Sequence, residues 1–193
     1  MVLLRSIERQ GFATLASVYE RLAAVLVVVA LAGGCASAQG TAVEGAAIAH
    51  RSVLVGIVNK QQIFEADPRW SAAYERTRVE PGAARALAAV PPGATVDVFL
   101  GTWCGDSVRE VSRLLRYVEA MTAVPFALRL IAVDRSKSAP GFTEEAGLRY
   151  VPTFVVRRDG REVGRIIESP PRELGADLAA LLDGSASGEL SGR

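Results

Sequence analysis

The sequence holds few of the side chains that metal and nucleophile chemistry require. Its 193 residues include two cysteines, Cys35 and Cys104, and one histidine, His50. Two cysteines cannot form a disulfide framework or a four-cysteine zinc site. A Ser-His-Asp hydrolase would depend entirely on His50. The sequence also lacks a glycine-rich phosphate-binding loop and a metal-ligand cluster, so no metal and no cofactor are predicted.

Neither sign of charge is in excess. The 22 Lys+Arg nearly match the 21 Asp+Glu, for a net charge of +1. Nucleic-acid-binding proteins usually carry a basic excess, so no nucleic-acid partner is predicted. Half of the residues are hydrophobic (50%) and 22% are charged, which is typical of one globular domain at this length.

One apolar run stands near the N-terminus. Residues 22–34 carry no charge, and Arg5, Arg9 and Arg21 precede them. A membrane span needs about 20 residues, whereas a secretory signal has an apolar region of about 7–15. The sequence therefore predicts export to the cell envelope, either as a periplasmic protein or as a membrane-anchored lipoprotein.

Two processing sites and an uncleaved anchor remain as alternatives. Residues 36–38 fit the A-x-A pattern, with cleavage before Gln39. Residues 31–35 resemble a bacterial lipobox, in which Cys35 is lipidated and anchors the chain to the membrane. The chain is accordingly divided into a signal and start of a tether (1–38), a linker (39–52), a folded domain (53–183) and a disordered tail (184–193).

The apolar patterns of the folded part predict an α/β domain. A stripe of 3.6-residue spacing runs from Val108 to Met121, and Asp106 or Ser107 is placed to cap that helix. This helix lies between two apolar runs that are predicted strands. A strand–helix–strand unit of this kind favours a parallel pair of strands with a right-handed crossover. Strands are predicted at 53–58, 95–100, 126–133, 153–157 and 161–167. Helices are predicted at 71–77, 81–90 and 174–182, with a helical turn at 143–146.

Cys104 directly follows a predicted strand and opens the predicted helix. A helix N-terminus carries about half a positive charge and unpaired N–H groups, and both favour a thiolate. The thiolate is the nucleophile of disulfide exchange. Ser107 lies one turn further on, where its hydroxyl is predicted to donate to the sulfur, and Trp103 is expected to shield one side.

These residues resemble two motifs of the thioredoxin superfamily. The segment T-W-C-G-D-S, residues 102–107, is similar to its active-site loop, with Ser107 in place of the second cysteine. Residues 147–154 are similar to its G-x-x-x-x-P-T segment, which precedes a hairpin. The resemblance covers residues 95–182 and implies a thioredoxin fold, with a central mixed β-sheet flanked by helices and an N-terminal helical extension.

The resemblance also implies the site. Cys104 would be the catalytic nucleophile, with Ser107 beside it, and Pro152 would face the cysteine in a cis peptide bond. The backbone of Val151 would pair with the substrate chain like an edge strand. The implied substrate-binding residues are Trp103, Gly105, Asp106, Val151 and Pro152.

Three departures from the family pattern qualify this site. Without a second cysteine, a mixed disulfide on Cys104 needs an external thiol to resolve it. The family often has a buried acid six residues before the nucleophile, and that position is Val98 in this sequence. The neighbouring Asp97 is expected to point to the opposite face of the strand. Asp106 replaces a common proline, and its charge opposes thiolate formation beside the sulfur.

The leading hypothesis is a thiol–disulfide oxidoreductase with one nucleophilic cysteine. Its partners would be disulfide-bearing client proteins or small thiols, and an external reducing thiol. The alternatives are a non-catalytic peptide-binding or chaperone domain and, less compatible with export, an iron–sulfur cluster shared between two chains.

Two further patterns have simpler interpretations. The arginines at positions 109, 113 and 116 share a helix face, which is either solvated, with Glu110 pairing locally, or a docking patch for an acidic partner. Trp70 and Tyr74 are expected to pack in the core.

Overall fold

The computed structural model describes residues 51–142 and 147–192. The predicted signal segment, the lipidation site at Cys35, most of the linker and the helical turn at 143–146 lie outside these residues.

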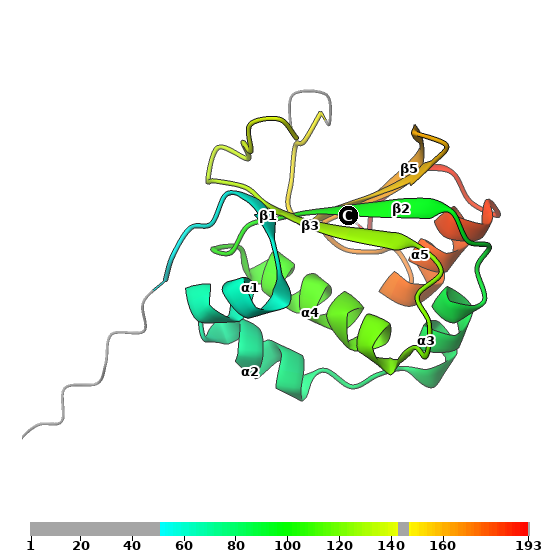
Figure 1. The fold of residues 1–193 in the computed structure, drawn as a ribbon, viewed down its shortest axis with the longest axis horizontal. Coiled ribbons are helices and arrows are strands. Elements are labelled where there is room, and N and C mark those ends of the chain that lie inside the picture. Colours follow the sequence, from blue (N-terminus) through cyan, green and yellow to red (C-terminus); the bar gives the residue numbers. More distant parts are fainter. Residues whose placement is uncertain (1–50, 143–146, 193) are drawn as a thin grey trace, which may run out of the picture. The chain divides into compact units, whose positions relative to one another are not determined.

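The described residues form a six-stranded mixed sheet in the order β1-β3-β2-β4-β5-β6 (Figure 1). β2 lies parallel to β3 and antiparallel to β4, and β4 and β5 form an antiparallel hairpin. β1 is antiparallel to β3, and β6 is parallel to β5. The strands are β1 (Gly56–Val58), β2 (Ala94–Leu100), β3 (Ala127–Ala132), β4 (Thr153–Arg158), β5 (Arg161–Ile167) and β6 (Gly188–Leu190).

The helices gather on one face of this sheet, below it in Figure 1. They are α1 (Lys60–Ala66), α2 (Arg69–Arg76), α3 (Pro81–Ala88), α4 (Gly105–Ala120) and α5 (Leu174–Asp183). Three of them precede β2 and form the expected N-terminal extension. The mixed sheet with flanking helices confirms the predicted fold class.

The main core lies between the helices and the sheet. The apolar stripe of α4 places Val111 and Leu114 there with no exposed surface, against Val98 of β2. Trp70 and Tyr74 of α2 join the same cluster at 0% and 8% exposure, as predicted. At roughly 25 cal/mol per Å² of apolar surface buried, this face supplies most of the hydrophobic stabilisation.

A smaller core lies on the opposite face. Trp103 and Cys104 are among the partly buried side chains that pack against it. The buried side chains that form it are Phe99, Ile131, Val133, Ala139, Val151 and Val155. No helix of the described residues covers this face; the segment that follows β3 crosses it, above the sheet in Figure 1. The cysteine therefore belongs to the more thinly covered side of the molecule.

Most predicted elements are present, with boundaries that differ by a few residues. The strand at 161–167 has the predicted bounds, and the Asp159–Gly160 turn joins it to β4. The strand predicted at 53–58 is shorter, and only Gly56–Val58 pairs with β3. α1 was not predicted.

The prediction of a disordered tail is wrong for residues 184–192, the part of the tail that the structure describes. Residues Gly188–Leu190 pair with β5 in parallel, and the N–H of Gly192 donates to the Ser169 carbonyl over 2.9 Å. The close approach depends on Gly164, because a Cβ there would lie 2.5 Å from the Gly188 carbonyl oxygen. A glycine in a neighbouring strand thus makes room for the last strand.

Candidate functional site

Cys104 stands at the junction of the loop after β2 and helix α4. It is the N-cap residue, with an extended backbone (φ −89°, ψ 126°), and its carbonyl accepts the first helical hydrogen bond, from the Val108 N–H over 3.0 Å. No side chain caps this helix, so the predicted capping by Asp106 or Ser107 is wrong. The partly buried thiol thus lies at the positive end of a 16-residue helix.

A hydrogen bond to Ser107 holds the loop before the cysteine in place. This side chain has no exposed surface, and its Oγ accepts a hydrogen bond from the Gly101 N–H over 3.1 Å. The predicted hydrogen bond from its hydroxyl to the sulfur is not among the interactions of the described residues. Ser107 therefore supports the strand-to-helix turn and is closed to an incoming substrate.

Trp103 covers one side of the same loop. Its Nε1 donates to the Val133 carbonyl over 3.3 Å, and the Arg135 guanidinium lies 5.3 Å from the centre of its rings. Gly101 gives the ring space, since a Cβ there would lie 2.8 Å from the Trp103 Cε2. The indole is thus fixed between Gly101 and the segment that follows β3.

The cysteine faces the segment before β4. The Val151–Pro152 peptide bond is cis, as predicted, and the Cys104 Sγ–H donates to the Val151 carbonyl oxygen over 3.2 Å. Val151 and Pro152 are buried side chains, whereas Gly105 beside the cysteine is exposed. The N–H of Glu168, the residue after β5, donates to the Pro152 carbonyl over 2.7 Å and anchors this segment. The two motifs of the sequence thus meet at one point.

A third group at the site, Arg69 of α2, is not predicted by any pattern in the sequence. Its Nη2 donates to the Trp103 carbonyl over 3.4 Å and pairs with Asp67 at 2.7 Å. The hydrogen bond with Asp67 raises the pKa of Arg69, and the neighbouring charge of Cys104 adds to the increase. A positive charge therefore lies within electrostatic reach of the sulfur, supplied by the N-terminal extension.

Asp67 orients this arginine. Its side chain is only 1% exposed. Burial alone would raise the pKa of Asp67, but the hydrogen bonds from Arg69 outweigh burial and the net pKa is lowered. The carboxylate stays ionised and fixes the guanidinium toward the loop that carries Cys104.

The charge of Asp106 is balanced locally. Arg109, one turn further along α4, pairs with its carboxylate at 2.7 Å and with the buried Glu110 at 2.7 Å. Arg113 also pairs with Glu110, and Arg116 pairs with Glu119. The local pairing predicted for this helix face is confirmed, and the opposition of Asp106 to a thiolate is reduced.

The acid of strand β2 lies away from the cysteine. Asp97 is buried on the second face, where Arg129 and Arg157 both pair with its carboxylate. Val98 occupies the helix-covered core, as its place in the strand predicted. Asp97 therefore serves as an ion-pair centre of the sheet rather than as a proton carrier for the site.

The described residues contain neither a cluster of metal ligands nor a helix suited to span a membrane. Among residues 51–142 and 147–192, no three or more of the His, Cys, Asp and Glu side chains are grouped as metal ligands. Over the same ranges no helix has both the length and the apolar character needed to cross a bilayer.

Comparison with curated proteins finds a partial similarity to a thioredoxin. The curated protein "Thioredoxin-3, mitochondrial" of Saccharomyces cerevisiae is 32% identical over 76 residues, which are 39% of this chain. The match spans little more than half (56%) of that relative. No family model matches the chain.

Solved structures align more distantly. A protein of unknown function from Pseudomonas aeruginosa gives a TM-score of 0.48 at 15% identity, over 68% of this chain and 88% of that one. The oxidized form of mitochondrial thioredoxin 3 from Saccharomyces cerevisiae gives 0.35 at 21% identity, over 58% and 98%. The chain is thus similar to a thioredoxin over part of its sequence.

Proposed function

We propose that this chain is a thiol–disulfide oxidoreductase that uses Cys104 as its single nucleophile. The observation that carries the proposal is the position of this cysteine at the head of α4, with its sulfur 3.2 Å from the Val151 carbonyl oxygen and beside Pro152. The similarity to a thioredoxin supports the same class of reaction.

The reaction conserves the number of disulfides. The Cys104 thiolate attacks one sulfur of a client disulfide, forms a mixed disulfide and expels the other client sulfur as a thiolate, which takes up a proton. An external thiolate then attacks the client sulfur of the mixed disulfide. It forms a new disulfide with the client and releases Cys104, so the external thiol is the species oxidised.

Three parts of the chain assist the sulfur. The N-terminus of α4 and the Arg69 guanidinium place positive charge beside a developing thiolate. Trp103 limits access from one side. The Val151 backbone is the edge along which an extended client chain would pair, as in the family that the site resembles.

The monothiol mechanism has a direct test in a Cys35→Ser chain, in which Cys104 is the remaining thiol. This chain should accelerate the exchange between 2-hydroxyethyl disulfide and a small external thiol at least tenfold. The Cys104→Ser chain should give only the uncatalysed rate. Absence of acceleration would overturn the proposal, and retention of client binding by Cys104→Ser would then favour the non-catalytic binding domain.

Ser107→Cys is a sharper variant because it supplies an internal thiol one turn from Cys104. In the Cys35→Ser chain that keeps Ser107, the mixed disulfide between Cys104 and a client peptide should persist without external thiol. When Ser107→Cys is added to the same chain, the lifetime of this mixed disulfide should fall at least tenfold. Spontaneous release from the chain with Ser107 would contradict the need for an external resolving thiol.

We also propose that the protein acts in the cell envelope, on the basis of the apolar run at 22–34 and the lipobox-like segment that ends at Cys35. The wild-type chain should fractionate with membranes, and Cys35→Ser should move it to the soluble periplasmic fraction. A soluble wild-type chain would instead favour cleavage before Gln39, and a cytoplasmic one would contradict export.

A further inference from the structure

A groove of about 560 Å³ begins next to the cysteine. Gly105, which directly follows Cys104, lines one end of it. From there the groove follows α4 and is bounded by the segment after α2 and by the start of α5. The exposed Gly105 leaves this end open, because a Cβ at that position would meet nothing within 4 Å.

Arginine is the dominant side chain of this groove. Five line it, and they come from three separate parts of the chain. They are Arg76 at the end of α2, Arg78 just after it, Arg109 and Arg113 on α4, and Arg172 before α5.

The acids that pair with these arginines are mostly buried, so the guanidinium groups face solvent. Arg113 and Arg172 are 32% and 65% exposed, whereas their partners Glu110 and Asp177 are 3% and 1% exposed. An arginine has five N–H donors, and these ion pairs engage only some of them. The groove therefore presents unused donors to a ligand.

Two of the arginines have no acidic partner among the described residues. Neither Arg76 nor Arg78 takes part in an ion pair there, and both are exposed. The groove also contains two acids, Glu80 and Glu173, and Glu173 accepts hydrogen bonds from the Tyr117 hydroxyl and the Ala176 N–H, over 2.5 and 3.0 Å. With five arginines against these two glutamates, the lining of the groove carries a net positive charge that favours an anion.

We propose that this arginine groove binds an acidic segment of the client polypeptide, next to the client cysteine that reacts with Cys104. This inference rests on the proposed function and adds a substrate class to it. A chain that places its disulfide at Cys104 can extend past Gly105 into the groove, where Asp and Glu side chains meet guanidinium groups in the fork geometry that favours carboxylates. Under this proposal, Arg109 and Arg113 keep their local ion pairs with Asp106 and Glu110 and also belong to a docking patch for an acidic partner.

The experiment measures peptide binding by the full chain with Cys104→Ser, so that thiol chemistry makes no contribution. Two fluorescent 12-residue peptides without cysteine are compared, one with four glutamates and one with glutamine at those four positions. At low salt the acidic peptide should bind at least tenfold more tightly. Raising the salt should reduce this difference, because exposed charges are screened.

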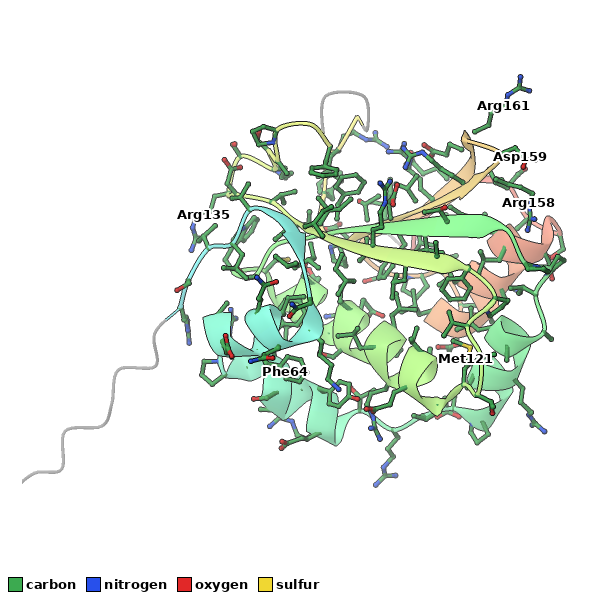
Figure 2. All side chains as sticks on the ribbon, viewed as in Figure 1. Phe64, Met121, Arg135, Arg158, Asp159 and Arg161 are labelled. Atoms are coloured by element: carbon green, nitrogen blue, oxygen red, sulfur yellow. The ribbon has the colours of Figure 1, made fainter. Side chains whose placement is uncertain are left out.

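Arg76→Gln/Arg78→Gln should weaken binding of the acidic peptide about tenfold and leave the glutamine peptide unchanged. The matched control is Arg85→Gln/Arg161→Gln, which removes the same charge from exposed positions outside the groove; Figure 2 shows Arg161 projecting from the β4–β5 hairpin. Equal binding of the two peptides, or an equal loss in the control pair, would overturn the proposal.

The outcome is separable from that of the proposed function. Exchange with the uncharged 2-hydroxyethyl disulfide tests Cys104 without the groove, and peptide binding by Cys104→Ser tests the groove without the thiol. If exchange occurs but the acidic peptide has no advantage, the groove proposal fails alone. If the acidic peptide binds but exchange is absent, the redox function fails alone.

Discussion

The two faces of strand β2 differ in what covers them. On one face Val96, Val98 and Leu100 are fully buried beneath the helices. On the other, Phe99 belongs to a smaller cluster and Asp97 is held by two arginines. The chain thus stabilises one face through apolar burial and the other through a mixture of a small core and ion pairs.

This difference bears on function because Cys104 packs against the smaller cluster. A nucleophile must be reachable by its substrate, and residues under a thick helical layer are not. The helix-covered face provides stability, whereas the thinly covered face provides access. Substitutions on the two faces should therefore separate the free energy of unfolding from reactivity.

The largest change in stability is expected from Leu114→Ala on the helix-covered face. Leu114 has no exposed surface, and truncation of a buried leucine costs about 2–5 kcal/mol. Urea unfolding should show a loss of about 3 kcal/mol, with thiol reactivity unchanged in the folded chain. Val124→Ala, at an exposed position, is the control and should change stability by less than about 0.5 kcal/mol.

Asp97→Asn tests the ion pairs of the second face. It leaves Arg129 and Arg157 beside one another without a negative partner, and a hydrogen-bonded charge of this kind contributes about 1.5–3 kcal/mol. The free energy of unfolding should fall by about 2 kcal/mol. Adding Arg129→Gln to Asp97→Asn should restore part of the lost free energy of unfolding. A loss of exchange activity in the folded Asp97→Asn variant would contradict a purely structural role for Asp97.

Arg69→Gln tests the charge next to Cys104. The lowered pKa of Asp67 stabilises the folded chain above about pH 4, and this contribution is lost as the pH falls through the lowered pKa. The variant should lose about 1–2 kcal/mol at pH 7 and show a smaller decrease in stability below pH 4.

The same variant should alkylate Cys104 about threefold more slowly at pH 7, an effect of under about 1 kcal/mol, because the positive charge beside the sulfur is removed. Arg85→Gln, which removes an exposed charge from α3, is the matched control. Equal slowing by Arg85→Gln would contradict a local effect of the Arg69 charge.

The smallest change in stability is expected from Gly101→Ala. The added Cβ would lie 2.8 Å from Trp103, so the indole must move away from Val133 and the cysteine. We expect a loss of about 1 kcal/mol and a red shift of the tryptophan fluorescence. Unchanged fluorescence would show that the loop relaxes without moving the ring.

The elements with clear periodicity could be predicted from the sequence. The stripe of α4 and the hairpin of β4 and β5 follow from local patterns alone. α1 has only two buried side chains in seven residues, although the capping box of Asn59 and Gln62 was a signal that could have found it. β6 could not be predicted, because its pairing depends on the space that Gly164 leaves in a distant strand.

The candidate site, like the fold, could be predicted from the sequence only where local motifs mark it. Cys104 and Pro152 come from motifs that lie next to their own strands, so a resemblance could bring them together. Arg69 could not be predicted, because it approaches Trp103 from 34 residues away through the packing of α2 on α4. Ser107 was correctly placed one turn from the cysteine, but its hydroxyl faces the Gly101 backbone instead of the sulfur.

The rate at which Cys104 is alkylated in the native and in the unfolded chain tests the central claim most directly. Mass spectrometry of the peptide that contains Cys104 separates it from Cys35. At pH 7 and low reagent concentration, the native thiol should react several-fold faster than the same thiol in denaturant, because the folded chain places positive charge beside it and leaves it accessible. A native rate equal to or below the unfolded rate would contradict the account.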